Sequence, residues 1–217
     1  VHLKEGPMMA SPDIFNIKVI GKGGHGAVPQ ESIDPIVITC QIVNSLQTIV
    51  SRKINPLDPV VITCGRIQGG DCHNVIPNEV ELEGTIRTFN EETRNWVPKV
   101  MEDLIRGITT SQGAAYEFKY EPKYPALIND KYMTSFAKES LKKVVGEENV
   151  FDLKEPNMGG EDFAYFAQKV PSAFIFVGIA NNKSEPVIHH NPYFKWDSKN
   201  VGILAQSLSQ IAIDYLK

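Results

Sequence analysis

The sequence predicts an α+β protein with a ferredoxin-like β-α-β-β-α-β sandwich over residues 13–121, followed by part of an α/β layer. The first observation is the order of the segments in which apolar residues recur at strand or helix spacing. Up to residue 121 this order is strand, helix, strand, strand, helix, strand. In that split β-α-β order, one antiparallel sheet carries two helices on one face. The second observation is the change of pattern after Pro122, where three amphipathic helices accompany a single apolar strand. So few elements can hardly bury their own apolar faces, which indicates half of a larger α/β layer.

The first strand and the first helix are both strongly patterned. Apolar and polar residues alternate over about 13–21, which predicts a half-buried strand. Asp34 can then cap a helix that has Pro35 in its first turn. Apolar residues at helical spacing continue to about residue 53: Ile36, Cys40, Val43, Leu46 and Val50. We expect this face of the helix to pack against the sheet.

Two strands follow, at 59–67 and 79–89, joined by the Gly-rich connection QGGDCHNVIPN at 68–78. Asn90 can cap a second helix that ends before Gly113. The remaining predicted elements are strand 114–122, helix 130–145, a short acidic helix at 161–168, the apolar strand SAFIFVGI at 172–179 and helix 197–217.

The composition excludes several classes of partner. The net charge of -4 comes without a basic stripe, so we expect no nucleic acid partner. No apolar run reaches the roughly 18 residues of a membrane span, so we expect no membrane partner. Cys40, Cys64 and Cys72 show no metal-binding or redox spacing, which fits a reducing, cytoplasmic compartment.

Three glycines of the segment VIGKGGHGAVP match the G-x-G-x-x-G spacing of a dinucleotide-binding turn: Gly21, Gly23 and Gly26. That interpretation requires a helix to begin at the last glycine, whereas the predicted helix begins only at Asp34. We expect instead that the glycines adopt positive φ and expose His25. A flexible loop that happens to contain a histidine is the alternative.

Other polar residues are candidates with structural alternatives. Asn74, which follows His73, can serve a site or only a turn. Arg87 can bind an anion or pair with Glu81 or Glu83 on its own strand face. In the split β-α-β arrangement, the loop after the first strand and the two central strands can be close. We therefore expect convergence of three residues: His25, Asn74 and Arg87.

Two further motifs lie in the second part of the chain. Glu161 follows two glycines at a predicted helix start, where capping is the alternative role. The segment HHNPYF offers His189 and His190 as metal ligands. A metal site needs three or four ligands, so other residues would have to complete it.

Seven strings in order carry a family resemblance: GPMMASPD, GKGGHGAVP, DPI, LQTIVSR, NVIPNEVELEGTIRTF, GGEDF and HNPYF. Together they resemble the C-terminal portion of the zinc-dependent amidohydrolases related to hippurate hydrolase, aminoacylase, and the N-acyl-amino-acid and indoleacetyl-amino-acid hydrolases. The resemblance implies a catalytic-domain segment at 1–12, a ferredoxin-like lid and dimerisation domain at 13–122, and a C-terminal catalytic segment at 123–217. It also implies a homodimer with two divalent metal ions (Zn, or Mn, Co or Ni) in the intact enzyme. The implied reaction is hydrolysis of the amide bond of a small N-acyl amino acid.

The resemblance also implies roles for individual residues. His25 would reach the active site of the partner subunit and polarise the scissile carbonyl. Asn74 and Arg87 would hold the substrate carbonyl and carboxylate, with Gly160 and Glu161 as further substrate-binding residues. The last metal ligand would be His190, with His189 as the fallback.

The chain also departs from that family. It lacks a Cys-and-His motif, the Glu-Glu pair that supplies the general base, and a further histidine, all of which lie upstream of the lid in such enzymes. We therefore expect a truncated form that holds no metal and is inactive alone. The alternative is a non-catalytic ferredoxin-like module for self-association or small-ligand binding, although such a module has no need of HHNPYF.

Overall fold

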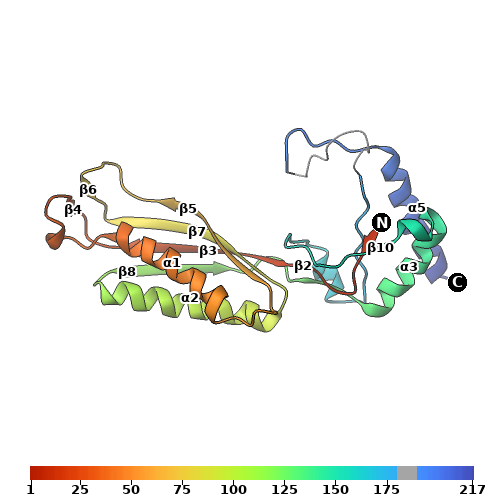
Figure 1. Ribbon diagram of the computed structural model, residues 1–217, viewed down its shortest axis with the longest axis horizontal. Coiled ribbons are helices and arrows are strands. Elements are labelled where there is room, and N and C mark those ends of the chain that lie inside the picture. Colours follow the sequence, from red (N-terminus) through yellow and green to blue (C-terminus); the bar gives the residue numbers. More distant parts are fainter. Residues whose placement is uncertain (180–189) are drawn as a thin grey trace. The chain divides into compact units, whose positions relative to one another are not determined.

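The computed structural model describes residues 1–179 and 190–217, so His189 lies outside the described residues. The chain divides into two compact units (Figure 1). The sandwich unit comprises Met9–Ala126 and Met158–Asp162. The terminal unit comprises Val1–Met8, Leu127–Asn157 and Phe163–Lys217.

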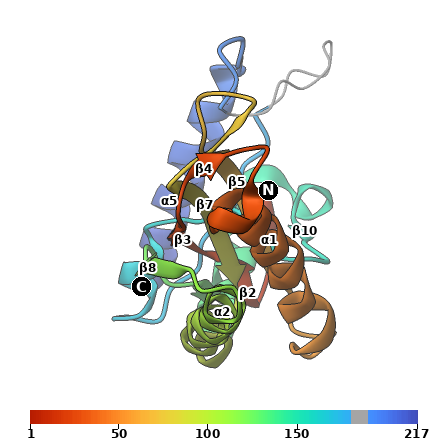
Figure 2. The ribbon, with the colours of Figure 1, turned by 90° about the vertical axis from the view of Figure 1, so that its left-hand side faces the viewer.

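The sandwich unit has the predicted ferredoxin-like architecture. Its main elements are β3 (Ser11–Ile20), α1 (Pro35–Arg52), β5 (Val60–Gln68), β7 (Glu79–Thr88), α2 (Glu91–Ser111) and β8 (Ala115–Glu121). The sheet order is β5-β7-β3-β8, and each neighbouring pair is antiparallel. Both helices cover the same face of the sheet (Figure 2). The predicted α+β fold is therefore confirmed.

The core of this unit follows from the two periodicities. Every second residue of β3 is fully buried, as at Phe15, Ile17 and Val19. The facing stripes of α1 and α2 are buried at helical spacing, at Ile38, Ile42, Leu46, Ile49, Val97, Met101 and Ile105. Of the stripe predicted on α1, Leu46 is buried, Val43 and Val50 are partly buried, and Ile36 and Cys40 are exposed, so the buried face is rotated from the predicted one. One face of the sheet is thus buried under the helices, and the other carries the polar side chains.

Both helices begin at the predicted caps. Asp34 Oδ1 accepts a hydrogen bond of 2.9 Å from the backbone N–H of Ile36. Asn90 Oδ1 accepts one of 2.8 Å from the backbone N–H of Glu92. Each cap satisfies a donor that has no partner within the helix, so it sets the first residue of the helix.

Two short strands that the sequence did not reveal join the loops at one end of the sheet. They are β4 (Gly24–His25) and β6 (Val75–Ile76), which pair antiparallel. The one-turn helix η1 (Pro29–Glu31) follows β4 and precedes α1. A two-residue strand carries no periodicity, so only the tertiary pairing reveals it.

The terminal unit is built from short pairs and three helices among its described residues. β1 (His2–Leu3) pairs parallel with β10 (Phe151–Asp152). β2 (Gly6–Met9), whose last residue belongs to the sandwich unit, pairs with β9 (Leu127–Asn129). Its helices are α3 (Lys131–Val145), α4 (Ala164–Ala167) and α5 (Lys199–Tyr215), with the one-turn η2 (Glu147–Asn149). The acidic helix expected over 161–168 is thus only four residues long. No helix of the described chain has the length and apolar character needed to cross a membrane.

The predicted strand at 172–179 was wrong, because its backbone groups are taken by other partners. Only Phe176 forms a β-bridge, with His2. The buried side chain of Asn129 accepts from Phe174 N at 2.7 Å and donates to Phe174 O at 3.0 Å. A β-strand would bond the N–H and C=O of Phe174 to the backbone of a neighbouring strand. Here the side-chain amide of Asn129 takes both of these groups, so no strand pairing forms at Phe174.

Candidate functional site

The glycines around His25 serve close backbone approach, and the expectation of positive φ was wrong. The described glycines with positive φ are Gly6, Gly70, Gly113 and Gly146, and none of them lies beside His25. A Cβ atom on Gly26 would instead lie 2.9 Å from Asn74 O, and one on Gly21 would overlap Ile33 O. The loop therefore needs glycine because other backbone segments pass against it.

The loop closes on neighbouring strands, and no helix begins at Gly26, since η1 starts at Pro29 and α1 at Pro35. This removes the phosphate-cradle alternative. Lys22 and Ile33 exchange two backbone hydrogen bonds, each 2.9 Å long. Asn78 holds the glycines from the other side: its Oδ1 accepts from Gly23 N at 2.9 Å, and its carbonyl accepts from Gly21 N at 2.8 Å. Asn78 is a structural residue that sequence reasoning missed, since nothing in its pattern distinguishes it from a turn residue.

The β4–β6 pair brings the backbones of His25 and Asn74 together, which is one part of the convergence that the sequence predicted. His25 lies opposite Val75, and the N–H of Gly26 donates to Asn74 O at 2.8 Å. The His25 side chain is exposed, and its Nδ1 accepts a hydrogen bond of 3.0 Å from the backbone N–H of Ala27. Because Nδ1 accepts, the proton of the neutral ring is on Nε2. His25 therefore offers an N–H donor to solvent.

Asn74 also has its acceptor atom occupied. The thiol of Cys72 donates to Asn74 Oδ1 at 2.9 Å, and both side chains are exposed. The atom left for a ligand is Nδ2, which is a donor. We call His25 and Asn74 the tip pair.

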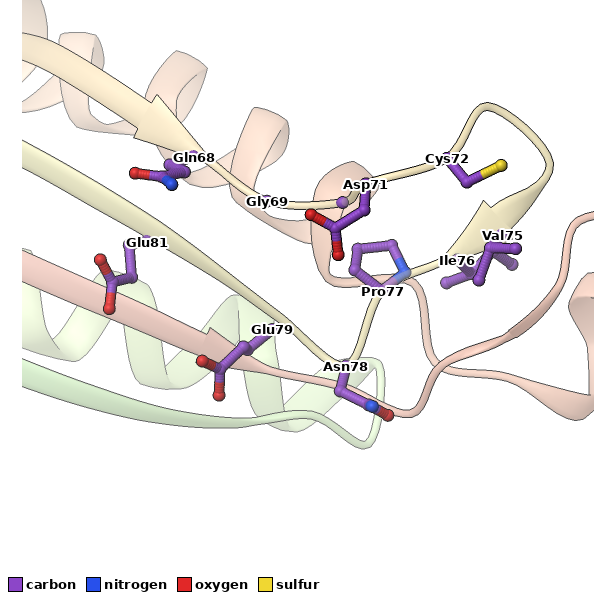
Figure 3. A pocket seen from close by; sticks show the side chains of 11 residues that line it. Gln68, Gly69, Asp71, Cys72, Val75, Ile76, Pro77, Asn78, Glu79 and Glu81 are labelled. Atoms are coloured by element: carbon purple, nitrogen blue, oxygen red, sulfur yellow. The ribbon is translucent and has the colours of Figure 1, made fainter.

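A cavity of about 660 Å³ is lined by the connection between β5 and β7 and by the start of β7 (Figure 3). Its walls are residues 68–72, 75–79 and 81. Three carboxylates belong to this lining, from Asp71, Glu79 and Glu81. Negative charge at this end of the sheet disfavours a carboxylate ligand there.

Arg87 does not converge with the tip pair, which corrects the expectation from sequence. Ile20, at the end of β3 that leads to the tip pair, pairs with Glu79, whereas Arg87 pairs with Pro12 at the start of β3. Arg87 is eight steps after Glu79 along β7, which is about 26 Å at a rise of roughly 3.3 Å per residue. Arg87 and the tip pair therefore lie at opposite ends of the sheet.

The expected pairing of Arg87 with a glutamate on its own strand is also absent from the described hydrogen bonds and ion pairs. Of the two expected partners, Glu83 is bound by Arg66 at 2.7 Å, and no described hydrogen bond or ion pair joins Arg87 to Glu81. Arg87 is half-buried. Its guanidinium is thus not committed to Glu81 or Glu83.

Gly160 lies at the same end as Arg87. The segment that contains Gly160 and Glu161 belongs to the sandwich unit, and the N–H of Ala10 donates to Gly159 O at 3.0 Å. A Cβ atom on Gly160 would overlap the ring of Pro12, the residue that pairs with Arg87. We call Arg87, Gly160 and Glu161 the base group.

The metal-ligand candidates do not form a site by themselves. His190 is exposed and has φ of 67°, in the left-handed region that non-glycine residues rarely adopt. Over residues 1–179 and 190–217, no group of three or more His, Cys, Asp and Glu side chains is placed to hold a metal ion. The residues described here therefore do not fit a complete metal site.

Comparison with known proteins shows what the chain resembles. The profile of Peptidase family M20/M25/M40 matches residues 1–213. N-acetylcysteine deacetylase of Bacillus subtilis (strain 168) is 39% identical over 217 residues, covering 100% of this chain and 55% of its own length. N-acyl-L-amino acid amidohydrolase of Geobacillus stearothermophilus is 52% identical over 124 residues, covering 57% of this chain and 34% of its own length.

A solved structure shares the fold over nearly the whole chain. The crystal structure of the Bacillus subtilis YXEP protein, described as a dinuclear metal binding peptidase, superposes with a TM-score of 0.78 at 34% identity. The match covers 99% of this chain and 52% of that one. The chain thus spans about half the length of the relatives that it matches end to end.

Proposed function

Because the chain belongs to Peptidase family M20/M25/M40, we propose that it forms about half of a longer protein and that this longer protein hydrolyses the amide bond of N-acyl amino acids. Relatives named N-acetylcysteine deacetylase and N-acyl-L-amino acid amidohydrolase support this substrate class. The structural observation that carries the proposal is the division of the candidate residues into the tip pair and the base group.

The division bears on how one substrate can be bound. An N-acyl amino acid is much shorter than the roughly 26 Å between the two ends of β7. One substrate can therefore meet both groups only when they come from different copies of the chain. A two-fold axis perpendicular to the strands places the tip pair of one copy beside the base group of the other.

The exposed side chains favour the β5 edge for this association. Val61 and Ile67 on β5 are 37% and 53% exposed, and Ile36 and Val37 on α1 are 41% and 49% exposed. The β8 edge instead presents the exposed, charged residues Glu117, Lys119 and Glu121. Charges on an edge strand oppose further pairing, whereas apolar side chains are stabilised when a second copy covers them.

The two groups match the two ends of the proposed substrate. Arg87 in the base group can form paired hydrogen bonds with the carboxylate of an amino acid. The tip pair offers two N–H donors, which suit the oxygen of the scissile carbonyl as it becomes negative. A donor of this kind can contribute about 3 kcal/mol to transition-state stabilisation. We expect His25→Ala in the longer protein to lower kcat at least about tenfold with an unchanged metal content.

Metal binding is proposed for the longer protein. The dinuclear description of the Bacillus subtilis structure supports two divalent ions, with His190 as one ligand. Because the described residues form no complete metal site, activation of the attacking water is assigned to none of them. We accordingly propose that the 217 residues alone are inactive. The free state of Cys40, Cys64 and Cys72 supports a reducing compartment such as the cytoplasm.

Subunit complementation tests the proposed shared site. The longer protein would be made as His25→Ala and as Arg87→Ala, and the two variants co-expressed in equal amounts. Half of the dimers are then mixed, and each mixed dimer has one site with both residues intact. We expect about a quarter of the wild-type activity to return, although each variant alone is nearly inactive.

The matched control co-expresses His25→Ala with Asn74→Ala, two changes in the same tip pair. No site in such a mixed dimer receives a complete tip pair, so activity should stay near that of the separate variants. Equal recovery in both mixtures, or recovery in neither, would reject the shared site. A wild-type protein that hydrolyses no N-acyl amino acid would reject the proposed reaction and favour the non-catalytic module.

A further inference from the structure

We infer that Cys72 is a positioning residue, whose thiol orients the Asn74 amide so that its N–H donors face the substrate oxygen. This inference rests on the proposed function, which makes the tip pair bind that oxygen. It assigns a task to a residue outside every motif that carries the family resemblance.

The contact between Cys72 and Asn74 determines which face of the amide is available. The thiol donates to Oδ1 at 2.9 Å, and Oδ1 is the acceptor atom of the asparagine side chain. With Oδ1 directed at sulfur, Nδ2 lies in the same plane on the opposite side of the Cβ–Cγ axis. A rotated amide would present an oxygen to the substrate oxygen, and the two would repel each other.

Asn74 depends on this contact because little else restrains its side chain. In the described part of the chain, the Cys72 thiol is the single hydrogen-bond partner of the Asn74 side chain. The backbone around it is well held: Gly26 N donates to Asn74 O at 2.8 Å, and Val75 N donates to Cys72 O at 3.3 Å. The thiol is therefore presented from a closed turn to a side chain that is otherwise free to rotate in solvent.

His25 follows the same arrangement with a different partner. Its acceptor atom Nδ1 is occupied by the backbone N–H of Ala27, which leaves Nε2–H as the outward donor. Both members of the tip pair thus have their acceptor atoms satisfied within the loops and keep donors for a ligand. The backbone N–H of Ala27 satisfies the acceptor of His25, and the thiol of Cys72 satisfies the acceptor of Asn74.

Kinetics of the longer protein provide the first test. Cys72→Ala removes the donor, and we expect kcat to fall between about threefold and tenfold while KM changes less than about twofold, because the donor acts on charge that develops during the reaction. Cys72→Ser keeps a hydroxyl donor and should restore most of kcat. Cys40→Ala is the matched control, since Cys40 is also an exposed free cysteine but lies on α1. Equal kcat in wild type and Cys72→Ala would overturn the inference.

A second readout does not depend on activity. Rotation about χ2 exchanges the positions of Oδ1 and Nδ2, so NOEs from the Asn74 Nδ2 protons to neighbouring protons, measured by NMR on the 217-residue chain, report which way the amide faces. We expect one NOE pattern with Nδ2 turned away from residue 72 in wild type and Cys72→Ser, and an averaged pattern in Cys72→Ala. An unchanged pattern in Cys72→Ala would refute the positioning role. If the longer protein shows no hydrolysis, the proposed function fails, and these NOEs still decide whether Cys72 orients Asn74.

Discussion

Arg94 of α2 donates two hydrogen bonds, each 2.8 Å long, to the fully buried carboxylate of Asp13 on β3. The hydroxyl of Tyr120 and the backbone N–H of Lys123 donate to the same carboxylate, at 2.5 Å and 2.9 Å. The hydrogen bond to Asp13 raises the pKa of Arg94 above its ordinary value. The network ties together the start of β3, the first turn of α2 and the end of β8.

Removing the charge of Asp13 should destabilise the sandwich unit. We expect Asp13→Asn to lower the free energy of unfolding by about 3–5 kcal/mol, because it leaves the buried guanidinium of Arg94 without a counter-charge. Urea denaturation of the 217-residue chain measures this change. The control is Glu91→Gln, because Glu91 is 61% exposed and lies 3.5 Å from Arg94. That change should cost less than about 1 kcal/mol. Equal effects of the two substitutions would contradict the importance of burial.

Tyr120 should make the unit sensitive to alkali. Burial, followed by the hydrogen bond to Asp13, raises the pKa of Tyr120 above its ordinary value. The folded state therefore disfavours the phenolate, and the stabilisation is complete below about pH 10, the pKa of an unfolded tyrosine. It is lost as the pH rises through the folded-state pKa. We expect Tyr120→Phe to reduce the fall in Tm above pH 10. Parallel Tm curves for the two proteins would refute this.

Asp214 should make the terminal unit sensitive to acid. The hydrogen bond from Lys143, with further ones from Ser140 and Gln210, lowers the pKa of Asp214 to about 2. A lowered pKa stabilises the fold above the unfolded value of 3.8, and this stabilisation is lost as the pH falls from 3.8 to about 2. We expect Asp214→Asn to lower Tm at pH 7 and to have little effect at pH 2. A difference that stays constant between these pH values would count against the predicted linkage.

Gly160 should be required for the base group. In Gly160→Ala the new methyl group would overlap the ring of Pro12, so the segment must move away from Pro12, the residue that pairs with Arg87. We expect KM of the longer protein to rise between about tenfold and 100-fold, since small displacements of binding groups are costly. Gly107→Ala is the control, because a Cβ atom there meets no atom within 4 Å. It should leave KM unchanged and stabilise α2 by about 0.5–1 kcal/mol. A KM for Gly160→Ala equal to that of the control would disprove the close packing.

The sandwich was predictable because its elements are long enough to show their periods. The alternation in β3 and the capped start of α1 are local features, and the structure confirms both. The stripe predicted on α1 was shifted around the helix, since Ile36 and Cys40 are exposed and Ile38 and Ile42 are buried. The strand expected at 172–179 failed because Asn129, more than 40 residues away, binds the backbone of Phe174. An apolar run therefore predicts burial more reliably than it predicts pairing.

The sequence selected the candidate site residues but did not reveal how they are arranged. The resemblance selected His25, Asn74, Arg87, Gly160 and Glu161, and their roles stay predictions. Strand direction then decided their grouping, since β7 begins beside the tip pair and ends at Arg87. The contact between Cys72 and Asn74 could not be read from spacing, because a turn can direct its side chains in many ways.

By itself the sequence determined the class of fold, the two helix starts and the chemical types of the site residues, because each depends on neighbours within a few positions. Only the tertiary structure decided that the histidine and the arginine lie at opposite ends of one sheet. The reason is physical. Each residue of an extended strand adds about 3.3 Å to its length, so the direction in which β7 runs in the sheet sets the distance between Arg87 and the tip pair.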